Sequence, residues 1–181
     1  SIIRPASYCG IIGYKPTFGT ISRTGVLKTA DTLDTIGFFS NYMDDIMMIF
    51  NSVRQKGQNY PIINKKMDKI SNKFKEKKRI GILIGPKSQN ISSNLLNSFE
   101  KFINNSKNKN FIFEKFRLSK FFDDAHKYHN ILYSKSLSYY LMSEFNNQPR
   151  KFSKSLTKMI LQGQKFSLSD YKKALNYQRK L

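Results

Sequence analysis

Residues 1–26, SIIRPASYCGIIGYKPTFGTISRTGV, are the part of the chain on which the interpretation of the fold depends. They are rich in Gly, Thr and Pro and poor in charge, and this composition continues to residue 39. Such composition favours short strands and tight loops over helix. Within it, the compact apolar stretches 10–15 and 33–39 are predicted to be buried strands.

The middle of the chain predicts a strand–helix–strand unit. Residues 79–86 form a short apolar run closed by Gly85 and Pro86, which is typical of a buried parallel strand. Apolar side chains then recur at helical spacing over residues 92–103, and residues 110–118 alternate like a second strand. Strand, helix and strand in this order indicate a βαβ unit, so we predict an α/β fold with helices covering the sheet.

The other apolar repeats have the spacing of helices. The first, residues 40–53, follows Ser40 and Asn41, which are suitable N-cap residues. Later helices are predicted at residues 123–144, at residues 153–162 with an end at Gly163, and from Ser167, where Ser167 and Asp170 have the spacing of a capping box.

The composition restricts the function classes. The 181 residues carry 32 Lys and Arg against 12 Asp and Glu, a formal charge of +20. Only seven of the basic residues are arginine, the side chain that recognises phosphates and bases in a bidentate manner, and the lysines are dispersed. We therefore interpret the charge as solvated surface and expect no nucleic acid partner. No run of about 18 apolar residues occurs, so we expect no membrane span.

Cysteine and histidine offer little support for metal or thiol chemistry. Cys9 is the single cysteine, which precludes an intramolecular disulfide and favours a reducing, cytoplasmic setting. Its apolar neighbours predict a small buried side chain and not a nucleophile. His126 and His129 share a helix face near Asp123 and Asp124, but there is no His-Glu-x-x-His, so we expect exposed helix residues and no metal. No P-loop or GxGxxG is present, and no cofactor is predicted.

Ser1 is the strongest candidate for chemistry. Taken alone, an N-terminal serine could use its own amine as a base. The residues that follow it at fixed spacing resemble the amidase signature family from its nucleophilic serine onward. The matching residues are Ser1, Pro5, Ala6, Cys9, Gly10, Gly13, Lys15, Pro16, Thr17, Gly19, Ser22, Gly25, Leu33, Asp34, Thr35 and Gly37.

The resemblance implies a fold and a reaction. Family members have a large mixed sheet covered by helices on both faces, and they hydrolyse carboxylic amides through an acyl-serine intermediate. Ser1 would be the nucleophile, whereas the lysine base and the bridging serine of the family lie upstream of it; Lys15 would have a structural role. We therefore expect residues 1–181 to be the C-terminal portion of a single amidase domain, truncated at both ends, and inactive and poorly soluble when made alone.

One position departs from the commonest family pattern. Most members carry arginine two positions after the serine, but here Ile3 occupies that position and the arginine is Arg4. The order Ser-Ile-Ile-Arg-Pro resembles the subset that includes malonamidase, in which the later arginine contacts a substrate carboxylate. Arg4 is thus a candidate substrate-binding residue, with pairing to a structural carboxylate as the alternative. The predicted partner is a small-molecule amide.

Two other functions stay open. One is the A-type amidotransferase subunit that acts on misacylated transfer RNA, against which Ile3 counts because those subunits carry arginine at that position. The other is a catalytically inactive homologue retained as a binding module. A lysine upstream of Ser1 would favour an enzyme, and its absence would favour the binding module.

Overall fold

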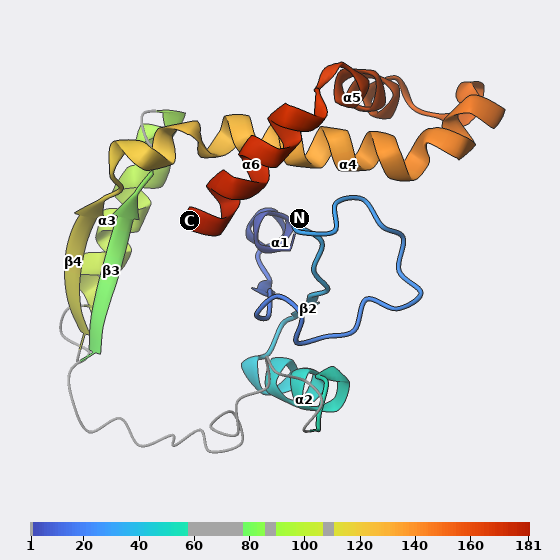
Figure 1. Ribbon diagram of the computed structural model, residues 1–181. Helices are drawn as coiled ribbons and strands as arrows, with labels where there is room; N and C mark the ends of the chain where they lie inside the picture. The colour runs from blue at the N-terminus through green and yellow to red at the C-terminus, as the bar shows by residue number, and fades with distance from the viewer. Residues whose placement is uncertain (1, 58–77, 86–89, 107–110) are drawn as a thin grey trace. The chain divides into compact units, whose positions relative to one another are not determined.

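The computed structural model describes residues 2–57, 78–85, 90–106 and 111–181 (Figure 1). These residues belong to two compact units. The first comprises Ser1–Ile70 and Tyr133–Gly163, the second Ser71–Leu132 and Gln164–Leu181. None of the described helices is both long and apolar enough to cross a membrane.

The first unit begins with a helix where strand and loop were predicted. α1 spans Ile3–Cys9, with Pro5 in its first turn and Gly10 as its C-cap at φ 66°. Proline is tolerated in a first helical turn, and glycine readily adopts the left-handed conformation that ends a helix. The residues that indicated a loop therefore mark the two ends of a short helix.

A short antiparallel pair follows. β1 (Ile12–Tyr14) pairs with β2 (Phe38–Ser40), with Gly13 opposite Phe39. The first strand lies within the predicted stretch 10–15, but of the stretch 33–39 only the last two residues are extended, so most of that prediction was wrong. The preceding residues form a loop around the side chain of Asp34, whose hydrogen bonds compete with strand pairing.

Helix α2 (Met43–Val53) confirms the predicted amphipathic helix. Ile46 and Phe50 are buried at 1% and 8% exposure. The ring of Tyr14 lies 5.3 Å from that of Phe50. Ser40 accepts a hydrogen bond from the Tyr42 N–H at 3.1 Å, so it supports the start of the helix although Tyr42 is the N-cap.

The second unit contains the predicted βαβ unit. β3 (Lys78–Ile84) and β4 (Phe111–Arg117) are parallel and in register, and α3 (Ser93–Ser106) connects them in sequence. The α/β class is therefore confirmed, although the described strands form two separate two-stranded sheets. The predicted burial of the first strand was wrong, since Leu83 is 66% exposed. Parallel strands are normally covered on both faces. The described residues do not cover both faces of β3 and β4.

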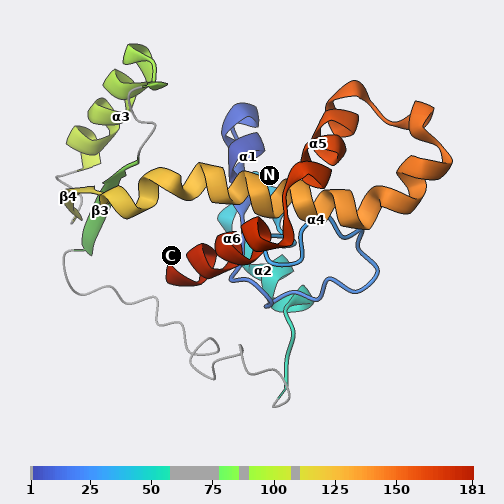
Figure 2. The same cartoon turned by 45° about the horizontal axis from the view of Figure 1, so that its top comes forward.

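The C-terminal part of the chain is helical, as Figures 1 and 2 show. The chain passes from one unit to the other twice in this region, after Leu132 within α4, the longest described helix, and after Gly163 within α5. The elements in order are η3 (Lys120–Asp124), α4 (Ala125–Asn147), η4 (Pro149–Lys151), α5 (Lys154–Lys165) and α6 (Leu168–Lys180). The predicted capping box at Ser167 and Asp170 is confirmed.

Gly163 does not end a helix, contrary to the prediction. It lies inside α5 and is buried, and a Cβ atom built there would lie 1.9 Å from the Ser134 carbonyl oxygen of α4. Leu137, Leu141 and Ile160 form the buried cluster between these helices in the first unit. The glycine is therefore a packing residue that allows α5 to approach α4 closely.

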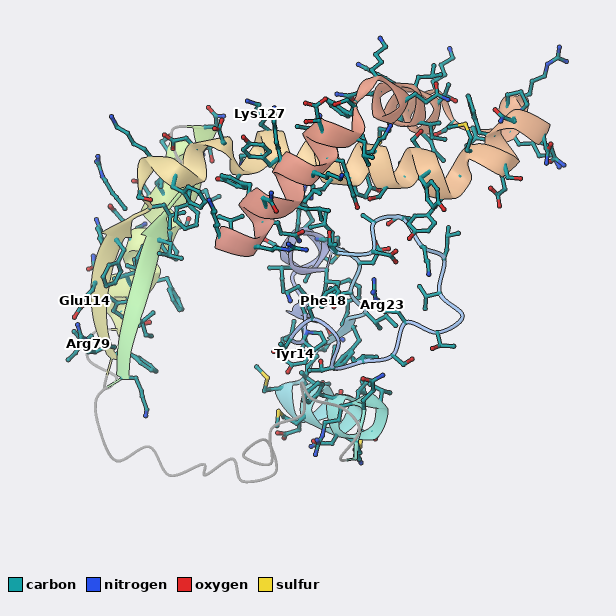
Figure 3. The ribbon with its side chains drawn as sticks, in the orientation of Figure 1. Tyr14, Phe18, Arg23, Arg79, Glu114 and Lys127 are labelled. Atoms are coloured by element: carbon teal, nitrogen blue, oxygen red, sulfur yellow. The ribbon has the colours of Figure 1, made fainter. Side chains whose placement is uncertain are left out.

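Aromatic rings hold α6 in the second unit. The Tyr177 ring stacks on Phe121 of η3 with a centroid distance of 4.6 Å and on Tyr128 of α4 at 4.3 Å. The Lys127 ammonium lies 5.5 Å from the Tyr128 ring (Figure 3). Ala174 of α6 is fully buried. The ring contacts of Tyr177 thus join α6 to η3 and to the start of α4 within this unit.

Candidate active site

The predicted nucleophile, Ser1, lies outside the described residues, which begin at the residue bonded to it. The carbonyl oxygen of Ile2 accepts a hydrogen bond from the Ala6 N–H at 3.2 Å. Ile2 is thus held at the first turn of α1. The chain that follows Ser1 is helix α1, and residues of the motif pack against the start of this helix.

Two glycines of the motif, Gly13 and Gly37, lie so close to the start of α1 that a side chain would not fit at either position. A Cβ atom at Gly13 would lie 2.7 Å from the Ala6 Cβ and 3.2 Å from the Ile2 carbonyl oxygen. One at Gly37 would lie 2.2 Å from the Ile2 Cδ1 and 2.4 Å from the Tyr14 carbonyl oxygen. We call Ala6, Gly13 and Gly37 the Ile2 packing site. Side chains larger than hydrogen at either glycine would displace Ile2 or its strand neighbours.

Arg4 lies on the exposed side of α1. Its guanidinium carbon is 5.8 Å from the centroid of the Tyr8 ring, one helical turn further on. No carboxylate among the described residues pairs with it. In this part of the chain, a cation–π contact is the interaction that orients the side chain, and a guanidinium in that contact retains its N–H donors.

Asp34 organises the loop that leads into β2. Its carboxylate accepts hydrogen bonds from the Thr29 N–H at 2.8 Å, the Thr29 hydroxyl at 2.6 Å and the Ala30 N–H at 2.9 Å. Partial burial opposes its ionisation, but the hydrogen bonds from Thr29 and Ala30, with a smaller contribution from the charge of Arg23, outweigh burial and lower the pKa of Asp34. The aspartate of the Leu-Asp-Thr motif is therefore a structural anion.

An open cavity of about 380 Å³ lies between this loop and the preceding one in the first unit. Arg23 lines it, donating through Nη1 to the Asp31 carbonyl oxygen at 2.9 Å, and its guanidinium carbon lies 5.0 Å from the Phe18 ring (Figure 3). The Tyr140 hydroxyl of α4 donates to the Asp31 carboxylate. No role for Arg23 is predicted from the sequence; its position between two motif residues, Ser22 and Gly25, is the signal that could have indicated one.

The remaining candidates are not brought together. Cys9 is exposed, which corrects the prediction that it is buried; α1 is short and buries only Ala6 among its described side chains. Lys15 donates to the Pro16 carbonyl oxygen at 2.8 Å. His126 and His129 are exposed on α4, and no group of three metal-ligating side chains was found among the described residues.

The fold and these contacts define an α/β protein in which a glycine-rich segment packs closely against the helix that follows a serine. The chain belongs to the amidase family, whose model, described as "Amidase", matches residues 1–181. This finding confirms the resemblance drawn from the motif.

Curated relatives match parts of the chain. The A subunit of the glutamyl-tRNA(Gln) amidotransferase of Sulfurimonas denitrificans is 35% identical over 105 residues, which is 58% of this chain and 24% of the relative. The protein of the same name from Mycoplasma pneumoniae is 35% identical over 89 residues, 46% of this chain and 19% of the relative. The aligned parts of the chain thus span about a quarter or less of the length of these relatives.

Solved structures share the fold. One, titled "Crystal structure of amidase", superimposes with a TM-score of 0.82 at 16% identity, covering 100% of this chain and 38% of that one. Another, from "An unexpected vestigial protein complex reveals the evolutionary origins of an s-triazine catabolic enzyme", gives a TM-score of 0.80 at 17% identity, covering 99% of this chain and 39% of that one. The described arrangement is therefore part of the amidase fold.

Proposed function

We propose that this chain carries the nucleophile of an amidase that hydrolyses a carboxylic amide through an acyl intermediate on Ser1. The family match over residues 1–181 carries the proposal, because it includes the serine at its motif position. The contacts of Gly13, Gly37 and Asp34 support it, because they explain why glycine or aspartate is needed at these positions of the motif.

The chemistry follows the family's reaction. A serine hydroxyl needs a base to remove its proton, and a lysine kept neutral by desolvation can supply one through a bridging serine. In the family both residues precede the nucleophile, so we propose that polypeptide upstream of Ser1 supplies them. Ser1 then attacks the amide carbonyl, backbone N–H groups stabilise the oxyanion, the amine leaves, and water releases the acid. The 181-residue chain alone is predicted to be inactive.

Ser1→Ala in the complete protein tests the proposal. Amide hydrolysis is expected to fall by roughly a thousandfold or more, since the acyl intermediate can no longer form. Ser7→Ala is the matched control, because Ser7 is an exposed serine of α1. Full activity of the Ser1→Ala protein would contradict the proposal, and turnover by the isolated chain would contradict the predicted need for upstream residues.

We further propose that Arg4 binds a carboxylate of the substrate. It lies three residues from Ser1, has no carboxylate partner among the described residues, and is oriented by Tyr8. Arg4→Ala is expected to raise KM for malonamate about tenfold or more, because a charge-assisted hydrogen bond is lost. Isovaleramide, in which two methyl groups stand in place of the two carboxylate oxygens, has a similar shape without the charge; it serves as the control substrate and should keep its KM. Equal effects on both substrates would refute this role.

The A-type amidotransferase subunit is the second candidate function. The 35% identity to proteins of that name in Sulfurimonas denitrificans and Mycoplasma pneumoniae favours it. Ile3, at the position where those subunits carry arginine, counts against it. Glutamine hydrolysis that is stimulated by partner subunits and misacylated transfer RNA would decide for the amidotransferase. Hydrolysis of small amides without either would decide for the amidase, and an inactive complete protein would indicate the binding module.

A further inference from the structure

The geometry points to a binding site for a small aliphatic monocarboxylate in the open cavity beside Arg23. The cavity measures about 380 Å³, and the residues that line it belong to the first unit. Small-molecule sites in proteins cover roughly 300–1,000 Å³ and combine apolar walls with a few polar groups. Here Ile21, Val26 and Leu27 are apolar, and Arg23 offers charged N–H groups. The lining therefore suits a ligand with a short apolar body and one anionic group.

Arg23 is held in place from two sides and keeps donors for a ligand. Its Nη1 donates to the Asp31 carbonyl oxygen at 2.9 Å, and its guanidinium carbon lies 5.0 Å from the centroid of the Phe18 ring (Figure 3). A guanidinium has five N–H donors. No carboxylate among the described residues forms an ion pair with this one. Because a planar guanidinium matches the two oxygens of a carboxylate, Arg23 is a preorganised group for binding one.

The two carboxylates that line the cavity already have donors of their own. Asp31 accepts a hydrogen bond from the Tyr140 hydroxyl, and its Oδ1 lies 4.0 Å from the Lys28 ammonium. Asp34 accepts hydrogen bonds from its own loop. Partial burial opposes its ionisation, but these hydrogen bonds outweigh burial and lower the pKa of Asp34. Its negative charge repels a dianion such as phosphate more strongly than a monoanion, so the cavity favours a single carboxylate.

A pair of hydroxyls in the same lining supplies a second donor. The Ser22 and Thr24 hydroxyl oxygens lie 3.0 Å apart and share one hydrogen bond. The Ser22 oxygen also accepts a hydrogen bond from the Thr24 N–H at 3.2 Å. Two hydroxyls carry two protons and the bond between them uses one, so one O–H remains for a ligand oxygen. Arg23 and this hydroxyl pair thus bind the carboxylate, while the apolar lining contacts the aliphatic part.

The experiment uses isobutyrate as the probe and the complete protein without substitution. Phenylglyoxal modifies accessible guanidinium groups, and mass spectrometry of the digested protein gives the rate at each arginine. Isobutyrate at about ten times its Kd leaves roughly a tenth of the sites free, so modification of Arg23 should slow about tenfold. Arg150, an exposed arginine of η4, should react at an unchanged rate. The uncharged control 3-methylbutan-2-one, in which a methyl group replaces one carboxylate oxygen, should protect neither arginine.

A pair of variants measures the contribution of the guanidinium. Calorimetry is carried out in Arg4→Ala protein, so that the substrate site proposed above does not contribute to isobutyrate binding. In this background, Arg23→Gln should raise the Kd for isobutyrate about tenfold or more, because charge-assisted hydrogen bonds are lost. Arg150→Gln is the matched control, since it removes one positive charge from the same unit, and it should leave the Kd unchanged.

Each outcome decides the inference. Modification of Arg23 at the same rate with and without isobutyrate overturns it, as does equal protection by the ketone or an unchanged Kd in folded Arg23→Gln protein. Protection of Arg4 without protection of Arg23 would assign the carboxylate to the substrate site and also overturns it. If Arg23→Gln does not fold, the protection measurement on the unsubstituted protein decides. Isobutyrate contains no amide bond, so these results do not depend on the proposed hydrolysis.

Discussion

Two regions of the described chain, residues 2–40 and the β3–α3–β4 unit, differ in what determines their structure. Residues 2–40 contain little regular structure, yet their loops are fixed by specific contacts: the Ile2 packing site, the Asp34 hydrogen bonds and the buried Thr20. The β3–α3–β4 unit is regular, yet its apolar side chains are largely exposed, including Leu83 at 66%, Leu95 at 61% and Phe102 at 61%. In this protein, therefore, the region with the least regular secondary structure has the most specific side-chain contacts.

The difference has a physical cause. A loop has few backbone hydrogen bonds of its own, so side chains and glycine contacts must supply its structure, and each position becomes restrictive. In a βαβ unit, strand pairing and helix hydrogen bonds satisfy much of the backbone, so the sequence needs mainly apolar residues at the right period. Its stability then depends on what covers its faces. This is why the motif that identifies the family lies in the irregular segment.

The largest expected effect compares one apolar side chain from each region. Ile46→Ala removes a side chain that is 1% exposed, and Leu95→Ala one that is 61% exposed. In the isolated chain, urea denaturation followed by circular dichroism should show a loss of about 2–5 kcal/mol for Ile46→Ala. Leu95→Ala should change the free energy of unfolding by less than about 0.5 kcal/mol. Similar losses for both variants would show that the two regions do not differ in this way.

The same two variants separate the regions further in the complete protein. If additional polypeptide of the amidase fold covers α3, Leu95→Ala should there cost about 2 kcal/mol or more, because a buried side chain is truncated. Ile46→Ala should cost the same in both contexts. A Leu95 effect that stays small in the complete protein would show that α3 is exposed there as well.

A second pair compares glycines. Gly37→Ala introduces a Cβ 2.4 Å from a backbone oxygen, whereas Gly81→Ala introduces one 3.2 Å from the ring edge of Phe116, a side chain that is 46% exposed and free to move aside. We expect Gly37→Ala to cost about 1–3 kcal/mol through overpacking. Gly81→Ala should be close to neutral. Thermal denaturation measures both, and a neutral Gly37→Ala would remove the basis of the Ile2 packing site.

The third pair compares carboxylates. Asp34→Ala leaves the donors of Thr29 and Ala30 without their acceptor and is expected to cost about 1–2 kcal/mol at neutral pH. Glu114 accepts hydrogen bonds of 2.9 and 2.8 Å from Arg79 on the surface (Figure 3). Glu114→Ala should therefore change the free energy of unfolding little. Glu144→Ala, a change at an exposed residue of α4, controls for the loss of charge. Equal stability losses for all three would contradict the structural role of Asp34.

The Asp34 contribution also has a predicted pH dependence. The pKa of Asp34 is lower in the folded state than its ordinary value of 3.8. Its stabilisation is therefore fully present above that value and is lost as the pH falls through the lowered folded pKa. Acid unfolding of the parent and of Asp34→Ala should converge at low pH. Curves that stay parallel over this range would show that ionisation of Asp34 is not linked to folding.

Much of the regular structure could be predicted from the sequence. The period of the apolar residues indicated α2 and the βαβ unit, and the spacing of Ser167 and Asp170 indicated the capping box. Helix α1 was missed because Pro5 and Gly10 have the same composition signal in a loop as at the two ends of a helix. The exposure of β3 could not be predicted, since periodicity does not specify what covers a face.

The site could be predicted only at the level of the motif. Spacing indicated Ser1 and Arg4, but the packing of Gly13 and Gly37 around Ile2 depends on contacts between residues distant in the sequence. The same holds for Gly163, whose local position resembled a helix end and whose role depends on α4. Glycines that permit close approach and glycines that permit unusual backbone angles are indistinguishable in a single sequence.

Trapping the nucleophile would test the assignment of Ser1 without reference to any particular substrate. The complete protein is treated with a fluorophosphonate, digested, and analysed by mass spectrometry, with Ser1→Ala as the control. We expect a single stoichiometric adduct on the peptide that contains Ser1, loss of that adduct in Ser1→Ala, and parallel loss of amide hydrolysis. An adduct on another residue, or amide hydrolysis that persists in Ser1→Ala, would show that Ser1 is not the nucleophile.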